Sequence, residues 1–436
     1  MTSAREGRGQ EPSPRRLLGY ASWLLAALFF FYAWVLRVSP SVMVEQLMRD
    51  FAVTGAVLGN LSAIYFYAYA ALQMPVGIAH DRWGPRRVLT LAVLVAGAGA
   101  LIFAMAPSVG LAYLGRGLIG AGSAFGFVGS MVIAAAWFSP RRFAFLSGLA
   151  LALGILGGIG GQAPLAFAVE LTGWRTSMLW LAGGSLGLSL LTWLVVRDGP
   201  AAKAAAPRGG PAGSPPVLAA LWQVARRPQT LAIALFAGLI ASPALAFGGL
   251  WGVPYVMTAY EVGRPAAAFT MSSILLGWVV GGPFWGWLSD RLGLRKPPVI
   301  VASLVGTLTM AAALYLPGLS LDMFRLLLFL NGVGCAGMSV SFALVREQNP
   351  LGVTGAALGI VNMAAVASGA LFQPIIGLLL DLQWDGVLMD GARVYSIEAY
   401  GNALAILPAL CALALVTAFF IRETRCRPAE GARLTR

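Results

Sequence analysis

Three arginines interrupt long apolar stretches of this chain: Arg37 in "YAWVLRVSPSVM", Arg116 in "GRGLIGAGSAFGF" and Arg325 in "LDMFRLLLFLNG". At the centre of a membrane-spanning helix, a charged side chain costs about 2.5–3.5 kcal/mol, so each position needs a compensating role. The acidic residues of the same stretches fall toward their ends. Buried cations without a buried anion favour an anionic ligand, and binding of such a ligand is the chemistry that we expect.

The three arginines differ in depth. Arg37 lies about two-thirds of the way along its stretch, too far from either end for its side chain to reach water easily. Arg116 and Arg325 lie about two helical turns from the start of theirs, where a structural hydrogen bond or an extended side chain is the alternative to ligand binding. We expect Arg37 to bind the anion and include Arg116 as a second candidate.

Polar side chains that share helical faces extend this predicted site. At about 100° per residue, Tyr65, Tyr69 and Gln73 fall on one face, and so do Asn362 and Gln373. Interhelical hydrogen bonds and ordinary packing are the alternative roles for these amides and aromatic rings. The predicted substrate-binding residues are Arg37, Ser41, Tyr65, Tyr69, Gln73, Arg116, Gln162, Trp251, Tyr255, Asn362 and Gln373.

A charged segment, "GIAHDRWGPRR" at residues 77–87, is repeated as "GWLSDRLGLRK" at residues 286–296. A carboxylate among arginines forms charge-assisted hydrogen bonds, and we expect these bonds to form a gate that assembles only when the two copies approach. Anchoring of the loops at lipid headgroups is the alternative. His80 is expected to face solvent or the loop. The predicted gating residues are Asp81, Arg82, Arg86, Asp290 and Arg291, with Glu347 as a partner of the second copy.

Twelve apolar stretches must position these residues. The chain is 58% hydrophobic and only 11% charged, whereas soluble domains are roughly 25% charged. Roughly 20 helical residues cross a bilayer core about 30 Å thick. The sequence therefore predicts a membrane protein with spans near 18–45, 56–78, 88–106, 109–136, 143–169, 176–196, 229–257, 268–288, 298–317, 321–344, 352–380 and 400–421.

The net charge of +13 follows the connections between these spans. Alternate connections carry most of the Lys and Arg, whereas the opposite connections carry only Arg49, Arg175, Arg264 and Arg393. This asymmetry predicts that both termini are cytoplasmic, and it explains the basicity without a nucleic-acid partner. The apolar run after the basic N-terminus is too long for a signal-peptide core. The three cysteines are too scattered for disulfides or a metal site, so no metal or cofactor is expected.

The chain divides into two repeated halves. Residues 198–216 are rich in Pro, Gly and Ala and predict a linker. Gln162 matches Gln373 and Glu170 matches Asp381, both at an offset of 211 residues. The predicted parts are a cytoplasmic tail at 1–17, a six-helix half at 18–197, a cytoplasmic linker with a possible amphipathic helix at 198–228, a second half at 229–421, and a cytoplasmic tail at 422–436.

With these motifs, the chain resembles the major facilitator superfamily over essentially its whole length. The family signature G-x-x-x-D-R-x-G-R-[RK] is matched after the second span from Gly77 to Arg87, with Pro85 inserted, and after the eighth span from Gly286 to Lys296. A second signature, R-x-x-x-G-x-G, is matched by Arg116, Gly120 and Gly122. The Gly-Pro that ends the antiporter signature of drug exporters is absent, since Pro164 follows Ala163.

The resemblance implies an all-α membrane protein with twelve transmembrane helices in two parallel-repeat six-helix halves, the major facilitator fold. It further implies a secondary transporter working by alternating access, whose substrate we expect to be a small organic anion or zwitterion of carboxylate or amino-acid type. Efflux of amphipathic compounds is the alternative. We expect no enzymatic activity, a monomer, and a location in the bacterial inner membrane. The sequence indicates neither the substrate, nor the direction of transport, nor the coupling ion.

Overall fold

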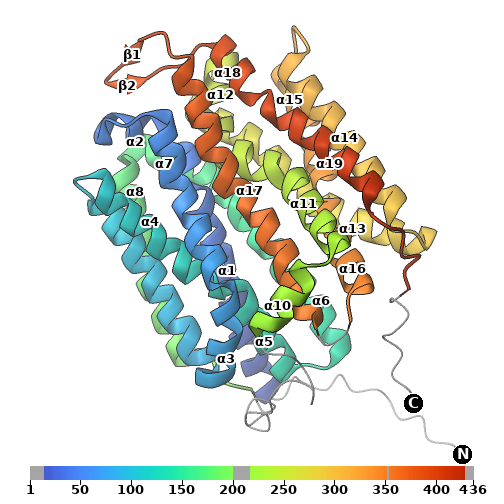
Figure 1. Ribbon diagram of the computed structural model, residues 1–436. Helices are drawn as coiled ribbons and strands as arrows, with labels where there is room; N and C mark the ends of the chain where they lie inside the picture. Colours follow the sequence, from blue (N-terminus) through green and yellow to red (C-terminus); the bar gives the residue numbers. More distant parts are fainter. Residues whose placement is uncertain (1–13, 200–216, 351–352, 428–436) are drawn as a thin grey trace, which may run out of the picture.

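The computed structural model describes residues 14–199, 217–350 and 353–427, and at positions 14–16, 74, 81, 140, 141, 144, 217, 218 and 220 it describes the backbone alone. Within these ranges, twelve helical spans are long and apolar enough to cross a membrane, as the sequence predicts. Most of each predicted tail and most of the predicted linker lie outside the described residues. Figure 1 shows the helices side by side in one elongated bundle.

The first half contains eight helical segments and a 3₁₀ turn. They are α1 (Pro14–Val38), the turn η1 (Ser39–Val42), α2 (Val44–Phe51), α3 (Gly55–Met105), α4 (Val109–Ser123), α5 (Phe125–Trp137), α6 (Pro140–Gly160), α7 (Ala163–Thr172) and α8 (Trp174–Val195).

The second half begins after the short helix α10 (Val217–Ala225), which lies where the sequence predicts an amphipathic helix. Its elements are α11 (Pro228–Ser242), the π-helical segment η2 (Pro243–Trp251), α12 (Gly252–Tyr260), α13 (Arg264–Leu292), α14 (Lys296–Tyr315), α15 (Leu321–Cys335), α16 (Met338–Gln348), α17 (Thr354–Leu382), β1 (Leu388–Met389), β2 (Ala392–Arg393), α18 (Ile397–Leu404) and α19 (Ile406–Phe420).

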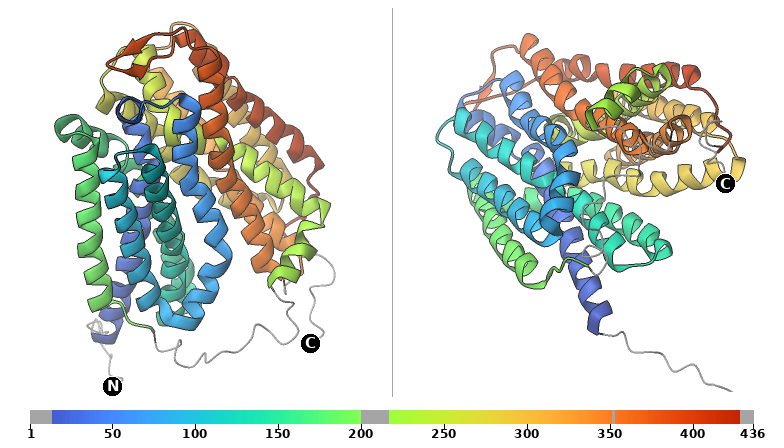
Figure 2. Two further views of the ribbon diagram at one scale, coloured as in Figure 1. Left: turned by 60° about the vertical axis from the view of Figure 1, so that its left-hand side comes forward. Right: turned by 60° about the horizontal axis from the view of Figure 1, so that its bottom comes forward.

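The two ends of the bundle differ in the segments that they carry. Strands β1 and β2 form a hairpin whose turn residues, Asp390 and Gly391, have positive φ angles of 51° and 84°, as a two-residue hairpin turn requires. We call the end of the bundle that carries this turn the hairpin end, at the top of Figure 1. The opposite end, which carries Arg86 and Arg295, is the basic end. The two views of Figure 2 show that the long helices run between these ends.

Helix α3 contains two spans, Gly55–Gln73 and Arg82–Met105. They meet at Gly84, whose φ of 75° lies in the left-handed region that glycine adopts without a steric penalty. The repeated charged segment therefore sits at a sharp change of direction of the backbone, at the basic end.

The sequence repeat reappears in the packing. A Cβ atom at Gly120 of α4 would collide with the backbone of Tyr65 of α3, and a Cβ at Gly332 of α15 would collide with the backbone of Ile274 of α13. Glycine at these two positions lets the helices of each half approach closely. The first of them belongs to the R-x-x-x-G-x-G signature, so the glycine of that motif has a packing role here.

Candidate functional site

Pro40 determines the structure around Arg37. Helix α1 ends at Val38, and Pro40 lies in the 3₁₀ turn that follows. Proline has no backbone N–H, so the carbonyl of Leu36, four residues earlier, has no α-helical donor. The Nη1 atom of Arg116 donates to this carbonyl at 2.7 Å, and its Nη2 donates to the carbonyls of Arg37 and Ser62 at 3.4 Å each. Arg116 is fully buried, so it has the structural role that the sequence left open.

Arg37 occupies a different environment. Its side chain is only 6% exposed, and its Nε donates to the hydroxyl of Tyr65 at 3.3 Å. The guanidinium carbon lies 4.2 Å from the ring centroid of Trp34, 5.0 Å from that of Tyr69 and 5.4 Å from that of Tyr65. Aromatic faces stabilise a cation without neutralising it. Among the described residues, no carboxylate lies within ion-pair distance of Arg37.

The predicted face of α3 adjoins this arginine. The rings of Tyr65 and Tyr69 are stacked with centroids 6.0 Å apart. Gln73, one turn further toward the basic end, is half-buried, and its Nε2 has no hydrogen-bond partner among the described residues. We call Arg37 and the three rings around it, those of Trp34, Tyr65 and Tyr69, the Arg37 cluster. Trp34 is not among the predicted site residues.

The two matched glutamines form symmetrical interhelical hydrogen bonds, the alternative role that the sequence analysis gave for these amides. The Nε2 of Gln162 donates to the carbonyl of Gly248 at 2.8 Å, and the Nε2 of Gln373 donates to the carbonyl of Leu245 at the same distance. Both acceptors lie in η2. Ser41 donates to Gln162 at 3.4 Å. The indole of Trp251 donates to the backbone of Gln373 at 2.8 Å.

These residues therefore join helices instead of lining an open site. Gln162, Gln373 and Trp251 are fully buried, and Ser41 is 1% exposed. Tyr255 packs against Phe247, Phe324 and Tyr400, and Asn362 is half-buried on α17. Neither of these two residues shares a described hydrogen bond or ring contact with the Arg37 cluster. In this conformation the predicted substrate site thus resolves into the Arg37 cluster and a separate set of packing contacts around η2.

The two halves are bonded to each other only from the hairpin end to about mid-depth. Asp381 of α17 accepts from the backbone N–H groups of Gly55 and Ala56 at 2.9 and 2.8 Å. Tyr67 donates to the carbonyl of Ala370 at 2.9 Å, and Gln162 donates to η2. Tyr67 lies 12 residues after Gly55, or about 18 Å along the helix. At the basic end, the described residues form no hydrogen bond or ion pair between the halves.

Two predicted gating residues of the second half, Asp290 and Glu347, form a cluster at the basic end around Arg295, which the sequence analysis did not select. Its Nη1 donates to Asp290 at 2.6 Å and its Nη2 to Glu347 at 2.7 Å. Both carboxylates hold the pKa of Arg295 above its ordinary value, although burial alone would lower it. All three residues belong to one half, so these bonds do not require the halves to approach, contrary to the expected assembly on closure. The side chain of Arg291 lies over the ring of Trp287 instead.

The first half differs at the equivalent place. The backbone N–H of Arg86 donates to Asp198 at 3.0 Å, and the side chain of Arg86 stacks on Trp193. Arg82 is exposed, and the side chain of Asp81 lies outside the described residues. His80, which we expected to face solvent, is 2% exposed and packs against Phe125.

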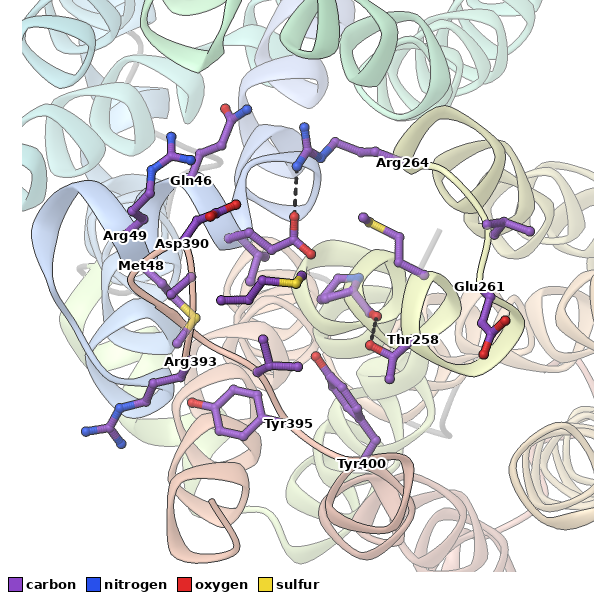
Figure 3. A pocket seen from close by; sticks show the side chains of 18 residues that line it. Gln46, Met48, Arg49, Thr258, Glu261, Arg264, Asp390, Arg393, Tyr395 and Tyr400 are labelled. Atoms are coloured by element: carbon purple, nitrogen blue, oxygen red, sulfur yellow. Dashed lines mark hydrogen bonds and ion pairs between the residues drawn. The ribbon is translucent and has the colours of Figure 1, made fainter. Parts of the chain in front are cut away.

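A cavity of about 460 Å³ opens between the halves at the hairpin end. Its wall combines α2 of the first half with α12, the hairpin and α18 of the second half. In Figure 3, Arg264 reaches over this cavity from one side and Arg49 lies on the opposite side. The Nη2 of Arg264 donates to Glu45 at 2.9 Å. No sequence pattern indicates this contact, because its two residues are 219 positions apart and lie in different halves.

Comparisons with known proteins agree with this architecture. The family profile of the Major Facilitator Superfamily matches residues 23–372 and 244–433. A probable nitrate/nitrite transporter of Mycobacterium tuberculosis is 29% identical over 82% of this chain and 86% of its own. A probable sulfoacetate transporter of Cupriavidus necator is 28% identical over 40% of each chain. A multi-drug resistance efflux pump of Streptococcus pneumoniae is 34% identical over 29% of each chain.

The fold is also that of solved structures. A bacterial homolog of the human lysosomal transporter Spinster, in an inward-facing and unoccupied conformation, superposes with a TM-score of 0.79 at 16% identity, covering 95% of this chain and 98% of its own. The family profile, the twelve spans and the two six-helix halves lead to the same result: this chain belongs to the Major Facilitator Superfamily and is a multi-pass membrane transporter.

Proposed function

We propose that this transporter moves a small organic anion or zwitterion of carboxylate or amino-acid type, by alternating access, and that Arg37 binds the anionic group. The observation that carries this proposal is the buried guanidinium of Arg37, which lies among aromatic rings and has no carboxylate partner among the described residues. Its planar fork suits two parallel hydrogen bonds to a carboxylate. Two relatives are named for the transport of anions, nitrate/nitrite and sulfoacetate.

Alternating access follows from where the halves are bonded. The contacts of Asp381, Tyr67 and Gln162 hold the halves together at the hairpin end, while Asp290 and Glu347 bond within their own half. The positive-inside rule supports an orientation in a bacterial inner membrane with the basic end and both termini on the cytoplasmic side. In that orientation this conformation gives access from the cytoplasm, and the repeated charged segments act as the gate of the opposite state.

Efflux of amphipathic compounds is the alternative, supported by the aromatic rings around Arg37 and by the relative named as an efflux pump. A hydrophobic cation such as tetraphenylphosphonium discriminates between the two functions. A buried, unneutralised arginine repels that cation and attracts an anion. The proposed function therefore predicts binding of anions and no binding of tetraphenylphosphonium.

The test is ligand binding to the purified full-length protein in lipid nanodiscs. Sulfoacetate, pyruvate and nitrate are titrated while tryptophan fluorescence is recorded, since Trp34 lies 4.2 Å from the Arg37 guanidinium. Arg37→Ala is expected to weaken binding by roughly 30-fold or more, because a buried charge contact is worth about 2–5 kcal/mol. Arg37→Lys keeps the charge but loses the fork and should give a smaller loss.

The control is Arg175→Gln, which removes an arginine at the hairpin end that pairs with Asp50 at 3.6 Å and does not line the hairpin-end cavity. It should leave the affinity within about twofold, because exposed charges away from a binding site contribute little. Anion binding that survives in Arg37→Ala, or saturable binding of tetraphenylphosphonium to the wild type, would contradict the proposed function.

A further inference from the structure

We propose that Arg264 is an anion-receiving residue at the hairpin end. Glu45 occupies its guanidinium while the halves are closed there, and the carboxylate or other oxyanion of the transported substrate replaces Glu45 when the halves open. The proposal rests on the proposed function, since it assigns a second contact to the same anionic substrate. It differs from the Arg37 site in position, in the state that exposes it and in the residue that competes for it.

The hairpin-end cavity provides the space. It has a volume of about 460 Å³ and is lined by both halves, including Arg264 and Glu45 themselves. Such a volume is within the range of small-molecule sites. The hydroxyl of Tyr400, a residue that is 3% exposed, points into the cavity in Figure 3 and has no hydrogen-bond partner among the described residues. The cavity wall therefore contains an unused polar group beside the ion pair.

The ion pairs around the cavity single out Arg264. Three arginines contribute to its wall: Arg49, Arg264 and Arg393. Arg49 pairs with Asp50 at 3.3 Å within the first half, and Arg393 pairs with Asp381 at 3.1 Å within the second half. Only Arg264 pairs across the halves, with Glu45 at 2.9 Å. No other ion pair between the described residues joins the two halves.

Separation of the halves at this end therefore affects one arginine. Arg49 and Arg393 move together with their carboxylates, whereas Arg264 leaves Glu45 behind. In the closed conformation the side chain of Arg264 is only 15% exposed, so its guanidinium depends on Glu45 more than on water. Glu45 is 41% exposed, which leaves its own carboxylate accessible to water after separation. The freed guanidinium thus gains most from a new anion, and the freed carboxylate needs no new partner.

A substrate anion would then promote opening as well as bind. It interacts with Arg264 only in the open state, and a ligand shifts a conformational equilibrium by its difference in affinity for the two states. Exchange of Glu45 for substrate also keeps the charge of Arg264 balanced throughout the transition. Removing the charge of Arg264 and removing the charge of Glu45 should therefore have opposite effects on transport from the hairpin end.

The experiment measures the initial transport of sulfoacetate and pyruvate into membrane vesicles of both orientations, so that KM is obtained separately for each end of the protein. Arg264→Gln should raise KM at the hairpin end about tenfold or more and leave KM at the basic end unchanged, since the contact exists only in one state. Glu45→Gln removes the competitor and should lower KM at the hairpin end or leave it as in the wild type. Arg264→Lys should give an intermediate KM.

Arg175→Gln is the matched control, because Arg175 lies at the same end, pairs with Asp50 of its own half and does not line the cavity. KM should stay within about twofold. If Arg264 only latches the halves together, Glu45→Gln and Arg264→Gln will change KM equally, and this result overturns the inference. If these two variants change KM equally but anion binding still depends on Arg37, only the inference about Arg264 fails and the proposed function stands. A wild type that transports neither probe overturns both.

Discussion

Pro40 explains why a second arginine lies beside Arg37. The proline leaves the carbonyl of Leu36 without its α-helical donor, and Arg116 supplies that donor from α4 at 2.7 Å. The Nη1 and Nη2 atoms of Arg116 donate to the backbone, whereas its Nε has no partner among the described residues. Its equivalent in the second half, Arg325, bonds to Thr270 and Asp322 instead. Two buried arginines of the first half thus have separate roles, one structural and one available for a ligand.

At the residue scale, Arg116→Ala should lower stability and not ligand affinity. Removing the guanidinium breaks its hydrogen bonds to the buried carbonyls of Leu36, Arg37 and Ser62, at a cost of about 1–3 kcal/mol, while the hydroxyl of Ser39 still donates to Leu36 at 3.0 Å. The midpoint of thermal unfolding of the purified protein should fall, while the affinity of the folded fraction for sulfoacetate stays within about threefold. Arg116→Lys retains a donor and should recover part of the loss. An unchanged midpoint with lost affinity would instead place Arg116 in the binding site.

At the element scale, the N-terminus of α3 is capped by the other half of the molecule. The first N–H groups of a helix have no intrahelical acceptor, and Asp381 of α17 accepts two of them, from Gly55 and Ala56. Arg393 and Tyr395 donate to the same carboxylate at 3.1 and 2.7 Å and hold it in place. The cap therefore stabilises the closed hairpin end, because opening would separate the carboxylate from the helix.

Asp381→Asn should weaken this closure. Hydrogen bonds to a charged group contribute about 1.5–3 kcal/mol, so the open state should become roughly tenfold or more populated. A cysteine at Met257, which lines the hairpin-end cavity, reports the change as faster labelling by a maleimide added at that end. Asp390→Asn is the control, since Asp390 lines the same cavity without a described bond to the first half. Equal labelling rates in both variants would show that the cap does not control opening.

The segment after α19 is hydrogen-bonded to the cluster that Arg295 forms with Asp290 and Glu347. Glu423 accepts from the backbone N–H groups of Arg295 and Lys296 at 2.9 and 2.7 Å, and Thr424 donates to Glu347. Burial alone would raise the pKa of Glu423, but backbone donors from Arg295, Arg425 and Lys296 lower it. The attachment is therefore complete above the ordinary pKa of about 4.3 and is lost as pH falls through the lowered value.

Glu423→Gln should loosen this segment at pH 7. The native thiol of Cys426, which is partly exposed, is a built-in reporter, since Cys335 and Cys411 are buried. We expect the variant to be labelled several-fold faster than the wild type at pH 7, as a charge-assisted bond is lost. The ratio of the two rates should fall toward one as pH falls through the lowered pKa, because both side chains are then neutral. A ratio of one at pH 7 would mean that Glu423 does not hold the segment.

At the scale of the whole molecule, the bonds between the halves that the described residues form run from the hairpin end to about mid-depth, whereas at the basic end Arg86 and Arg295 bond within their own halves. This distribution is what one state of an alternating-access cycle requires, because the bonded end must separate while the other end closes. The repeated motif supplies equivalent charged segments to both halves, but its bonds differ: Arg295 binds two carboxylates, whereas Arg86 stacks on Trp193. The two copies should therefore contribute unequally to gating.

The orientation of the whole molecule can be tested with two cysteines. The native Cys426 lies at the basic end, and Asp390→Cys introduces a thiol at the hairpin turn. In intact cells, a membrane-impermeant maleimide should label Asp390→Cys and leave Cys426 unreacted, and in inside-out vesicles the pattern should reverse, as the positive-inside rule predicts. Labelling of both thiols from one side would contradict the twelve-span topology.

The sequence alone determined the features that depend on short stretches of chain. Hydropathy defined the twelve spans, and the depth of Arg37 in an apolar run singled out that residue, because each of these signals is contained in about 20 neighbouring residues. The repeat predicted the two halves from a comparison of stretches about 211 residues apart, which needs residue types and no contacts. Tertiary structure decided which side chains meet. Gln162 and Gln373 lie on the predicted faces, yet both bond to η2, and Arg264 finds Glu45 across 219 residues. Helical periodicity fixes the direction of a side chain but not its partner, which depends on how closely the helices of two halves pack.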